Sequence, residues 1–583
     1  MPRYGIILPA LLLAVLTTLM SGRLCAQPVV VVHIEGIDSE LEANVRLFLS
    51  IEQQRDHSLM SAGRVRRLHQ KADKEIATAL QPYGFYRPQI KSTLTEVETD
   101  QWQASYVIDR GPGLPIAEFN LEVTGALKDD PALQAMVDKQ TLKPGNIFTH
   151  PEYDRLKSKL SGLASERGYV EAKFTRARVE IDLDNYVARV YLAIESGPRY
   201  SFGKVSLEQN VLEPELLQRY IPFNEGDPYS LNQIIRLQQA LNDSNYFAIA
   251  EVSPGTPLTD SKEIPVSVSL SPRKRHRYNF GLGYGTDTGA RAKFGWRMPR
   301  VNEKGHRIDS EIEVSEIGYD LSANYRIPVL NPRTDQLVYT VSKEKEETST
   351  NESILTSVGV SLNHNRAKWR EVLTLTYEQE TFAVADDAGD SYLLIPGVSW
   401  SRTWGQEFIN VIDGVRLDTG VRGASEKVLS ETDFIQLRGG IKFITSISPR
   451  NRFLVRGDFG ITETPDFSQL PSSIRFFAGG SQSVRGYGYE ELGPVNDNGD
   501  VVGGKYLLTG SIEFEHFFTD RWGVAVFLDA GNAINDLSDD LEEGAGFGLR
   551  WKSPVGPVRI DLANAISTVD QDWRLHISIG PDL

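Results

Sequence analysis

The second half of the sequence alternates between apolar and polar residues, and this pattern constrains the fold more than any other feature. In YDLSANYRIPV (319–329), apolar side chains occupy every second position, and Asp320, Ser322, Asn324 and Arg326 fill the positions between them. A repeat of two is the period of a β-strand that has one apolar face. The pattern therefore predicts strands, and it replaces helical spacing from about Tyr278 onward.

Similar alternating segments recur, and Gly, Asn, Asp and Pro turns separate them. They include residues 435–443, 506–515, 522–529 and 573–579. Strands of about ten residues with one apolar face are typical of a transmembrane β-barrel. At that length, plus connections, residues 273–583 allow about sixteen antiparallel strands. The alternative for this half is a large soluble antiparallel sandwich.

The first 26 residues indicate export. Arg3 provides a positive start, Ile6–Met20 forms an apolar run of secretory length, and Ala26 suits the last position before cleavage. We predict a signal peptide over residues 1–26, and the alternative is an uncleaved anchor. No later run of eighteen apolar residues occurs, so a membrane-embedded mature chain would have to be a closed barrel.

Composition excludes several kinds of protein. The chain has one cysteine, Cys25, inside the predicted leader, which excludes a disulfide scaffold and thiol chemistry in the mature protein. The formal net charge of −16 argues against a nucleic-acid partner, whose phosphates must be neutralised. The nine histidines are dispersed, and neither HExxH nor GxSxG spacing occurs. We therefore predict no enzyme, cofactor or metal site.

Residues 28–272 contain a repeat with a period near eighty residues. In each unit an apolar helical pattern ends shortly before Gly or Asn followed by aromatic residues: GFY at Gly84, GYV at Gly168 and NYF at Asn245. Glycine and asparagine tolerate the left-handed conformation that ends a helix. In the first unit the helical face comprises Val65, Leu68, Ala72, Ile76 and Leu80.

Each unit reads as strand, helix, helix, strand, strand. Matched landmarks favour true repeats over three unrelated α+β domains. The predicted domains are residues 27–112, 113–197 and 198–272, followed by the barrel at 273–583.

The segment SSIRFFAGGSQSVRGYGYEELGPV (472–495) combines loop-forming glycines with aromatic side chains. A long loop of this kind is commonly functional. The alternation places Asp529 and Glu513 on the polar, inward-facing side of their strands. We therefore predict that this loop enters the barrel, where Arg485 meets Asp529 with Glu513 close by.

The order FFAGG, VRGY and then FLDAG (527–531) resembles the outer-membrane assembly-factor superfamily, whose members combine periplasmic POTRA domains with a sixteen-stranded barrel. Three repeats are most similar to its translocation and assembly module branch. The resemblance implies that the loop motif Val484, Arg485, Gly486 and Tyr487 folds into the lumen. It also implies an outer-membrane location in a Gram-negative bacterium, with the POTRA domains in the periplasm.

The resemblance further implies a weak seam between the first and last barrel strands. Three glycines in YNFGLGYGTD (278–287) agree with a weakly paired first strand. The seam residues are Tyr278, Phe280, Leu282 and Tyr284 on the first strand and Leu575, Ile577 and Ile579 on the last.

The implied function is the translocation and insertion of unfolded outer-membrane β-barrel clients, such as autotransporters, into the bilayer at this seam. A TamB-like protein anchored in the inner membrane would be the partner. The alternative is a two-partner secretion transporter, which would have two POTRA domains and a plug helix. A simple porin would need no periplasmic repeats, and an outer-membrane hydrolase would need a catalytic motif.

Overall fold

The computed structural model describes residues 28–579, except residues 56, 58–59, 406–411, 555 and 569–572. The predicted leader lies outside the described residues. The chain divides into two compact units. The first holds the two N-terminal repeats and part of the third, and the second holds the rest of the third repeat and the C-terminal sheet.

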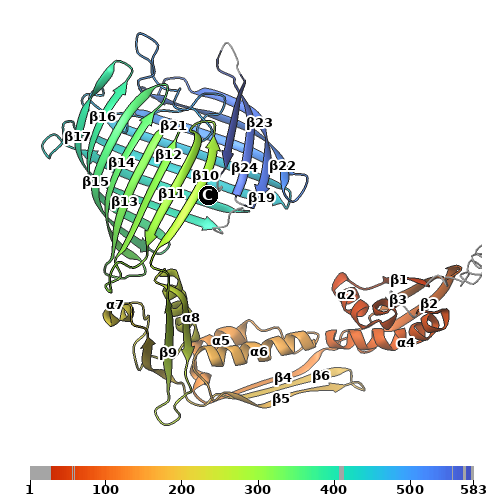
Figure 1. Ribbon diagram of the computed structural model, residues 1–583. Coiled ribbons are helices and arrows are strands. Elements are labelled where there is room, and N and C mark those ends of the chain that lie inside the picture. Colours follow the sequence, from red (N-terminus) through yellow and green to blue (C-terminus); the bar gives the residue numbers. More distant parts are fainter. Residues whose placement is uncertain are drawn as a thin grey trace, which may run out of the picture. The chain divides into compact units, whose positions relative to one another are not determined.

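Each repeat forms a three-stranded sheet with helices, as the sequence predicts (Figure 1). The sheet orders are β1-β3-β2, β4-β6-β5 and β7-β9-β8. The first repeat comprises β1 (Val29–Glu35), α2 (Ser39–Phe48), α3 (Ser50–Gln53), α4 (Ala62–Leu80), β2 (Gln89–Glu98) and β3 (Gln101–Asp109). The second comprises β4 (Ile116–Thr124), α5 (Pro131–Asp138), α6 (His150–Glu166), β5 (Lys173–Asp182) and β6 (Val187–Glu195). The third comprises β7 (Ser201–Glu208), α7 (Pro214–Gln218), α8 (Leu231–Asp243), β8 (Phe247–Pro254) and β9 (Glu263–Pro272).

The helix α4 shows how the pattern builds these small domains. The Ser61 side chain accepts a hydrogen bond from the Arg64 N–H and begins the helix. The predicted apolar face packs against β1 through Val30 and Val32 and is buried as a stripe. That face consists of Val65, Leu68, Ala72, Ile76 and Leu80.

The predicted helix-ending positions adopt positive φ, at +86° for Gly84, +84° for Gly168 and +62° for Asn245. Helix α6 begins with half of a capping box. The Thr149 hydroxyl accepts from the Glu152 N–H at 3.3 Å, while the Glu152 carboxylate accepts from the Thr141 hydroxyl at 2.7 Å.

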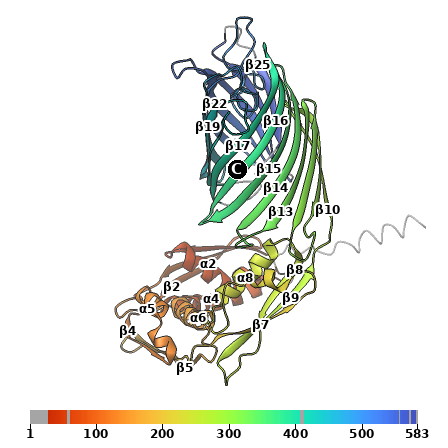
Figure 2. The same cartoon turned by 90° about the vertical axis from the view of Figure 1, so that its left-hand side faces the viewer.

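The remaining chain forms one sixteen-stranded sheet in which β10 to β25 follow sequence order and neighbours pair antiparallel. Figure 2 shows β13 to β17 as one tilted, curved wall. The strands are β10 (Arg277–Gly285), β11 (Gly289–Met298), β12 (Arg307–Ser315), β13 (Gly318–Pro328), β14 (Asp335–Glu347), β15 (Asn351–Arg366), β16 (Trp369–Val384), β17 (Asp387–Gly405), β18 (Gly414–Ala424), β19 (Phe434–Ser448), β20 (Asn451–Glu463), β21 (Tyr506–Phe517), β22 (Trp522–Ile534), β23 (Glu542–Ser553), β24 (Gly556–Ala565) and β25 (Trp573–Ile579). Within the described part of the chain, no helix is both long and apolar enough to cross a bilayer.

The alternation divides each barrel strand into an outer and an inner face, as predicted. In β22, Val526 and Leu528 are 57% and 52% exposed, whereas Phe527 and Asp529 are buried. Val526 and Leu528 thus face outward, where lipid would cover them, and Asp529 faces the lumen together with the Phe527 ring.

The barrel wall has one weak junction. Among the described residues no backbone ladder joins β10 to β25, although the two strands are neighbours (Figure 1). Two hydrogen bonds connect the junction: Thr286 N–H to the Ile577 carbonyl at 3.4 Å, and Ile577 N–H to Thr286 Oγ1 at 3.3 Å. The barrel is therefore nearly closed, with an unsealed seam.

Candidate functional site

Residues 464–505 connect β20 to β21 and fold back against the inward-facing side chains of the barrel. Val484, Arg485 and Tyr487 are buried there, although they belong to a loop. Val484 and Tyr487 pack in a small apolar cluster with Ala565 of β24. The aromatic and glycine content of this loop thus corresponds to burial inside the barrel. We call residues 464–505 the lumen loop.

Arg485 lies against Asp529 of β22. Its Nε and Nη2 atoms donate to the two oxygens of the Asp529 carboxylate at 2.7 and 2.8 Å, and its backbone N–H donates to the same carboxylate at 3.0 Å. The bidentate geometry fixes the guanidinium in orientation as well as position. Asp529 has no exposed surface and Arg485 is 4% exposed, so the pair is withdrawn from solvent.

Two further carboxylates complete the surroundings of Arg485. Its Nη1 donates to Glu513 at 2.7 Å and to Asp561 at 3.1 Å. Its guanidinium carbon also lies 3.4 Å from the centre of the Phe527 ring, within cation–π range. Asp529, Glu513 and Asp561 come from β22, β21 and β24, so one side chain connects the loop to three strands.

A second arginine offsets part of the remaining negative charge. Arg550 of β23 donates to Glu513 at 2.7 Å and to Glu515 at 3.1 Å, and it also pairs with Asp561. Glu515 also pairs with the buried Arg452 of β20. These guanidinium groups together offset the high cost of removing the four carboxylates from water. We call Arg485, Arg550, Glu513, Glu515, Asp529 and Asp561 the anchor network.

Gly544 on the inner face of β23 leaves room for the lumen loop, since a Cβ atom there would lie 1.9 Å from the Arg485 carbonyl oxygen. Gly546 instead leaves room for the neighbouring strands, since its Cβ atom would lie 2.2 Å from the Leu562 carbonyl oxygen and 2.6 Å from the Phe527 ring. Glycine in a strand interior commonly marks such a close approach. The sequence GAGFG (544–548) is thus part of the receptacle for the loop.

The loop also reaches the last strand. Gly486 has φ +104°, and its N–H donates to Nε2 of His576 on β25 at 3.0 Å. An acceptor Nε2 requires the neutral ring to carry its proton on Nδ1, the atom that lies 4.0 Å from Asp287. Tyr487 donates its hydroxyl hydrogen to Glu542 at 2.8 Å.

Contacts from the lumen loop fall on both sides of the seam. Ser481 donates its backbone N–H to Asp287, in the turn after β10, at 2.9 Å. Glu491 pairs with Arg574 of β25 at 3.1 Å. Together with the Gly486–His576 bond, these contacts form what we call the seam clasp: Ser481–Asp287 on the first hairpin, and Gly486–His576 and Glu491–Arg574 on the last strand.

The predicted seam residues lie on the outer faces of β10 and β25. The most exposed are Leu282 at 91% and Phe280 at 81%. The others are Tyr278, Tyr284, Leu575, Ile577 and Ile579. Their role in accepting a client stays a prediction.

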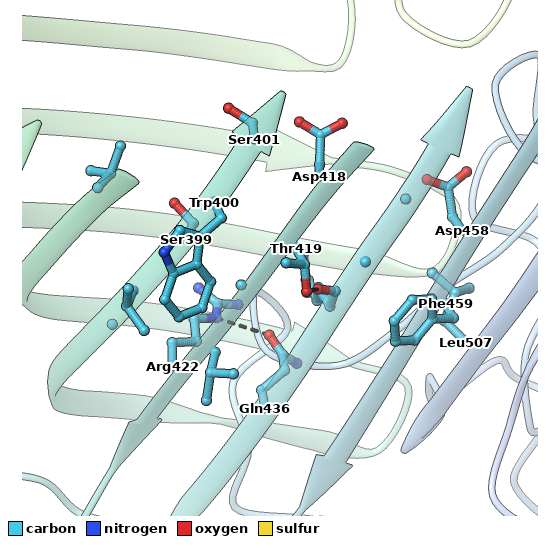
Figure 3. A pocket seen from close by; sticks show the side chains of 18 of the residues that line it. Ser399, Trp400, Ser401, Asp418, Thr419, Arg422, Gln436, Asp458, Phe459 and Leu507 are labelled. Carbon is cyan, nitrogen blue, oxygen red and sulfur yellow. Dashed lines mark hydrogen bonds between the residues drawn. The ribbon is translucent and has the colours of Figure 1, made fainter. Parts of the chain in front are cut away.

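Beside the lumen loop lies a cavity of about 940 Å³ bounded mainly by β16 to β21. Figure 3 shows Arg422 and Asp418 on one strand, with Gln436 on the next and Asp458 beyond it. Arg422 donates to Gln436 at 2.8 Å. The polar wall distinguishes this lumen from a packed protein core.

Sequence reasoning missed several members of the site. Asp561 and Arg550 alternate with apolar neighbours in RIDLA and LRW, so the inward-facing rule that identified Asp529 could have found them. Asp287 lies in a turn and Ser481 in a loop, and no periodic signal marks either. His576 follows the alternation of β25, but its bond to Gly486 depends on tertiary contact.

Family models match most of the chain. A model described as the Omp85 superfamily domain matches residues 274–582. A model described as POTRA domain TamA domain 1 matches residues 31–110, and one described as a surface antigen variable number repeat, a POTRA model, matches residues 200–273. The chain belongs to the Omp85 superfamily.

Known relatives share the Omp85 organisation. The chain is 21% identical over 558 residues to the outer membrane protein assembly factor BamA of Nitratidesulfovibrio vulgaris, covering 91% of this chain and 69% of that protein. The crystal structure of BamA from Haemophilus ducreyi lacking POTRA domains 1–3 matches with TM-score 0.67 at 17% identity, covering 80% of this chain and 99% of that one. This Omp85 protein is accordingly an outer-membrane barrel whose POTRA domains lie in the periplasm, as predicted.

Omp85 proteins serve membrane assembly and transport and are generally not enzymes. In the described residues, no group of three or more His, Cys, Asp or Glu side chains could hold a metal ion.

Proposed function

We propose that this Omp85 protein promotes the translocation and membrane insertion of β-barrel clients, autotransporters among them, through the β10–β25 seam. The observation that carries the proposal is that, in the part of the chain that the structure describes, no ladder joins β10 to β25, whereas the other neighbouring strands of the sheet are paired. An unpaired strand edge offers a row of N–H and C=O groups to an incoming strand.

Addition of a client strand at this edge would be energetically favourable. Backbone groups without partners are costly in hydrocarbon, because no water is available to hydrogen-bond them. A client strand that pairs with β10 would satisfy those groups and its own. The client's folding thus supplies the driving force, with no need for nucleotide.

The lumen loop supports a role in controlling the seam. It is held by the anchor network at β21–β24 and touches both seam edges through the seam clasp. Movement of this one loop would change contacts at both edges together. We infer that the VRGY motif, residues 484–487, positions the loop for this purpose.

A TamB-like partner anchored in the inner membrane is part of the proposal. The match of residues 31–110 to the TamA-type POTRA model supports it. Copurification of the partner with the full chain, compared with a chain lacking residues 31–110, would test this contact.

The mechanism is tested by a disulfide across the seam. Thr286 and Ile577 are hydrogen-bonded neighbours, and Cys25 is the only natural cysteine. In liposomes containing the Thr286→Cys/Ile577→Cys variant, oxidation should abolish the acceleration of client barrel insertion and reduction should restore it. Insertion is measured by the heat-modifiable gel mobility of the client.

A Leu362→Cys/Leu373→Cys variant provides the matched control, because this pair lies within the complete β15–β16 ladder. It should stay active when oxidised. Full activity of the oxidised seam variant would exclude a seam mechanism. Release of a soluble client across the vesicle, in place of insertion, would favour the secretion transporter.

A further inference from the structure

A hollow of about 570 Å³ lies at the periplasmic foot of the seam strand, where the third repeat meets the first periplasmic turn of the barrel. Its walls are contributed by residues 210–213, by Arg275 and by the turn 300–304. The walls are joined by a hydrogen bond from the Glu213 N–H to the Glu303 carbonyl at 2.9 Å. The turn is closed by Val301 N–H to the His306 carbonyl at 2.7 Å.

The hollow is lined by charges of both signs. Arg275, Arg300 and Lys304 supply three cations, and Glu213 and Glu303 supply two carboxylates. Within the described part of the chain, none of these cations makes an ion pair with either carboxylate, since no nitrogen–oxygen contact of 4.0 Å or less joins them. The Nη1 atom of Arg300 is buried and has no hydrogen-bond partner among the protein atoms, so an acceptor in the hollow, either water or a ligand, has to satisfy it.

A second, apolar hollow begins at the next residue along the chain. It has a volume of about 430 Å³ and lies on the outer face of β10–β12. His276 and Trp296 stack with ring centres 5.9 Å apart, and Trp296 Nε1–H donates to His276 Nδ1 at 3.1 Å. The complete lining is His276, Tyr278, Phe294, Trp296, Ser310 and Ile312.

We propose that these two hollows together bind one zwitterionic phospholipid of the phosphoethanolamine type. The phosphodiester would lie among Arg275, Arg300 and Lys304, and the ammonium group would face Glu213 and Glu303. One acyl chain would occupy the aromatic hollow, which is on the outward, hydrocarbon-facing side of the strands. Unpaired opposite charges around one hollow match a zwitterion better than a simple anion.

An aromatic girdle alone does not explain the arrangement. Trp522 and Trp551 also stack, with ring centres 5.5 Å apart, and Arg521 lies in the adjoining turn. The foot of β10 differs because it adds a charged hollow in which a buried guanidinium nitrogen lacks a partner. The lipid would therefore sit against the first seam strand.

The test is native mass spectrometry of the purified full chain with equal amounts of phosphatidylethanolamine, phosphatidylglycerol and phosphatidylcholine. We expect one phosphatidylethanolamine to be retained in preference to the other two lipids. Arg275→Gln, Arg300→Gln and Lys304→Gln should each weaken retention about fivefold, since a cation near a phosphate contributes about 1 kcal/mol. Glu213→Gln/Glu303→Gln should shift the preference toward phosphatidylglycerol.

Arg521→Gln is the matched control and should retain the lipid as the unmodified chain does. Heat-modifiable mobility verifies that each variant is folded. Equal retention of all three lipids would overturn the proposal, and so would an equal loss in the control. Displacement of the lipid by free phosphoethanolamine at a similar concentration would also overturn it, because the aromatic hollow would then contribute nothing.

Discussion

Two junctions in the barrel wall differ sharply. Strands β21 and β22 pair continuously from Tyr506 opposite Ile534 to Phe517 opposite Gly523, and the anchor network lies on their inner side. At the junction of β10 and β25, the described residues form two hydrogen bonds, both between Thr286, in the turn after β10, and Ile577, and the seam clasp lies on the inner side of these strands. The lumen loop contacts both junctions. The wall is continuously paired where the anchor network holds the loop, and it has few backbone hydrogen bonds where the seam clasp contacts the loop.

The difference indicates which pair of neighbouring strands requires the least free energy to separate. Separating β21 from β22 would break a full ladder and expose backbone groups to hydrocarbon. Separating β10 from β25 would break few backbone bonds, and the glycines of β10 add little side-chain packing.

Removal of the Arg485 side chain should have the largest effect. Arg485→Ala removes the paired cation of Asp529 and leaves Glu513 and Asp561 to Arg550, and breaking a buried pair costs about 3–5 kcal/mol. We expect the lumen loop to leave its site and client insertion to fall strongly, while the barrel stays folded. Protease sensitivity of residues 464–505 and the insertion assay measure the two effects.

Arg416→Ala is the control, since this lumen arginine pairs with Asp418 in an exposed position. It should leave the loop protected. If Arg485→Ala and Asp529→Asn are both silent in insertion, the anchor network has no functional role.

A methyl group on Gly544 should displace the loop without removing any charge. Its Cβ would lie 1.9 Å from the Arg485 carbonyl oxygen, and overpacking of this kind costs about 1–3 kcal/mol. Gly544→Ala should therefore increase hydrogen exchange at residues 484–487. Gly510→Ala is the matched control, because the nearest atoms to its added Cβ would be 3.9 Å away. Equal exchange in the two variants would contradict the close approach.

Weakening the seam clasp should have a smaller effect, which should appear at the seam itself. Asp287→Asn removes the charge from the acceptor of the Ser481 N–H. A buried hydrogen bond to a charged group contributes about 1.5–3 kcal/mol. The contribution of this bond should be smaller, because Asp287 is partly solvated. We expect the oxidised yield of the Thr286→Cys/Ile577→Cys pair to fall, since the edges would separate more often. Asp433→Asn is the control, because Asp433 accepts a hydrogen bond from the Glu426 N–H at 3.1 Å within the connection between β18 and β19, and it should leave the yield unchanged. A higher yield in Asp287→Asn would show that the clasp holds the seam open.

A pH effect outside the barrel should be the smallest and should not involve the seam. Burial alone would raise the pKa of Asp130, but the Ala132 N–H, Arg167 and Tyr169 donate to its carboxylate and hold the pKa below its usual value. Because the pKa is lower in the folded state, the ionised carboxylate stabilises the second repeat at pH values above the pKa of the unfolded chain, about 4. That stabilisation is lost as the pH falls further.

After correction for the intrinsic exchange rate at each pH, the protection of residues 113–197 from hydrogen exchange should therefore fall between pH 5 and pH 3, both about one unit from the ordinary carboxyl value. The fall should be steeper in the unmodified chain than in Asp130→Asn. A parallel change in the seam cross-link yield would contradict the independence of the two regions.

The sequence alone determined the architecture. Period-two alternation separates Leu528 from Asp529 on opposite faces of a strand, since successive side chains must point to opposite sides of a sheet. Helical spacing likewise identified Val65 to Leu80 as one buried face, because 3.6 residues complete a turn. The inward-facing rule was enough to suggest that Arg485 would meet Asp529, and the same rule applied to Asp561 and Arg550 would have extended the network. The domain boundaries and the roles of the site residues stay predictions.

Only the tertiary structure decided which edges meet and what the loop touches. The partners Ser481 and Asp287 are 194 positions apart, and Thr286 and Ile577 are 291 apart. No local pattern encodes such contacts, because strand register at the seam and the path of a loop depend on closure of the whole barrel. Local periodicity decides which way a side chain points, whereas closure decides what it meets.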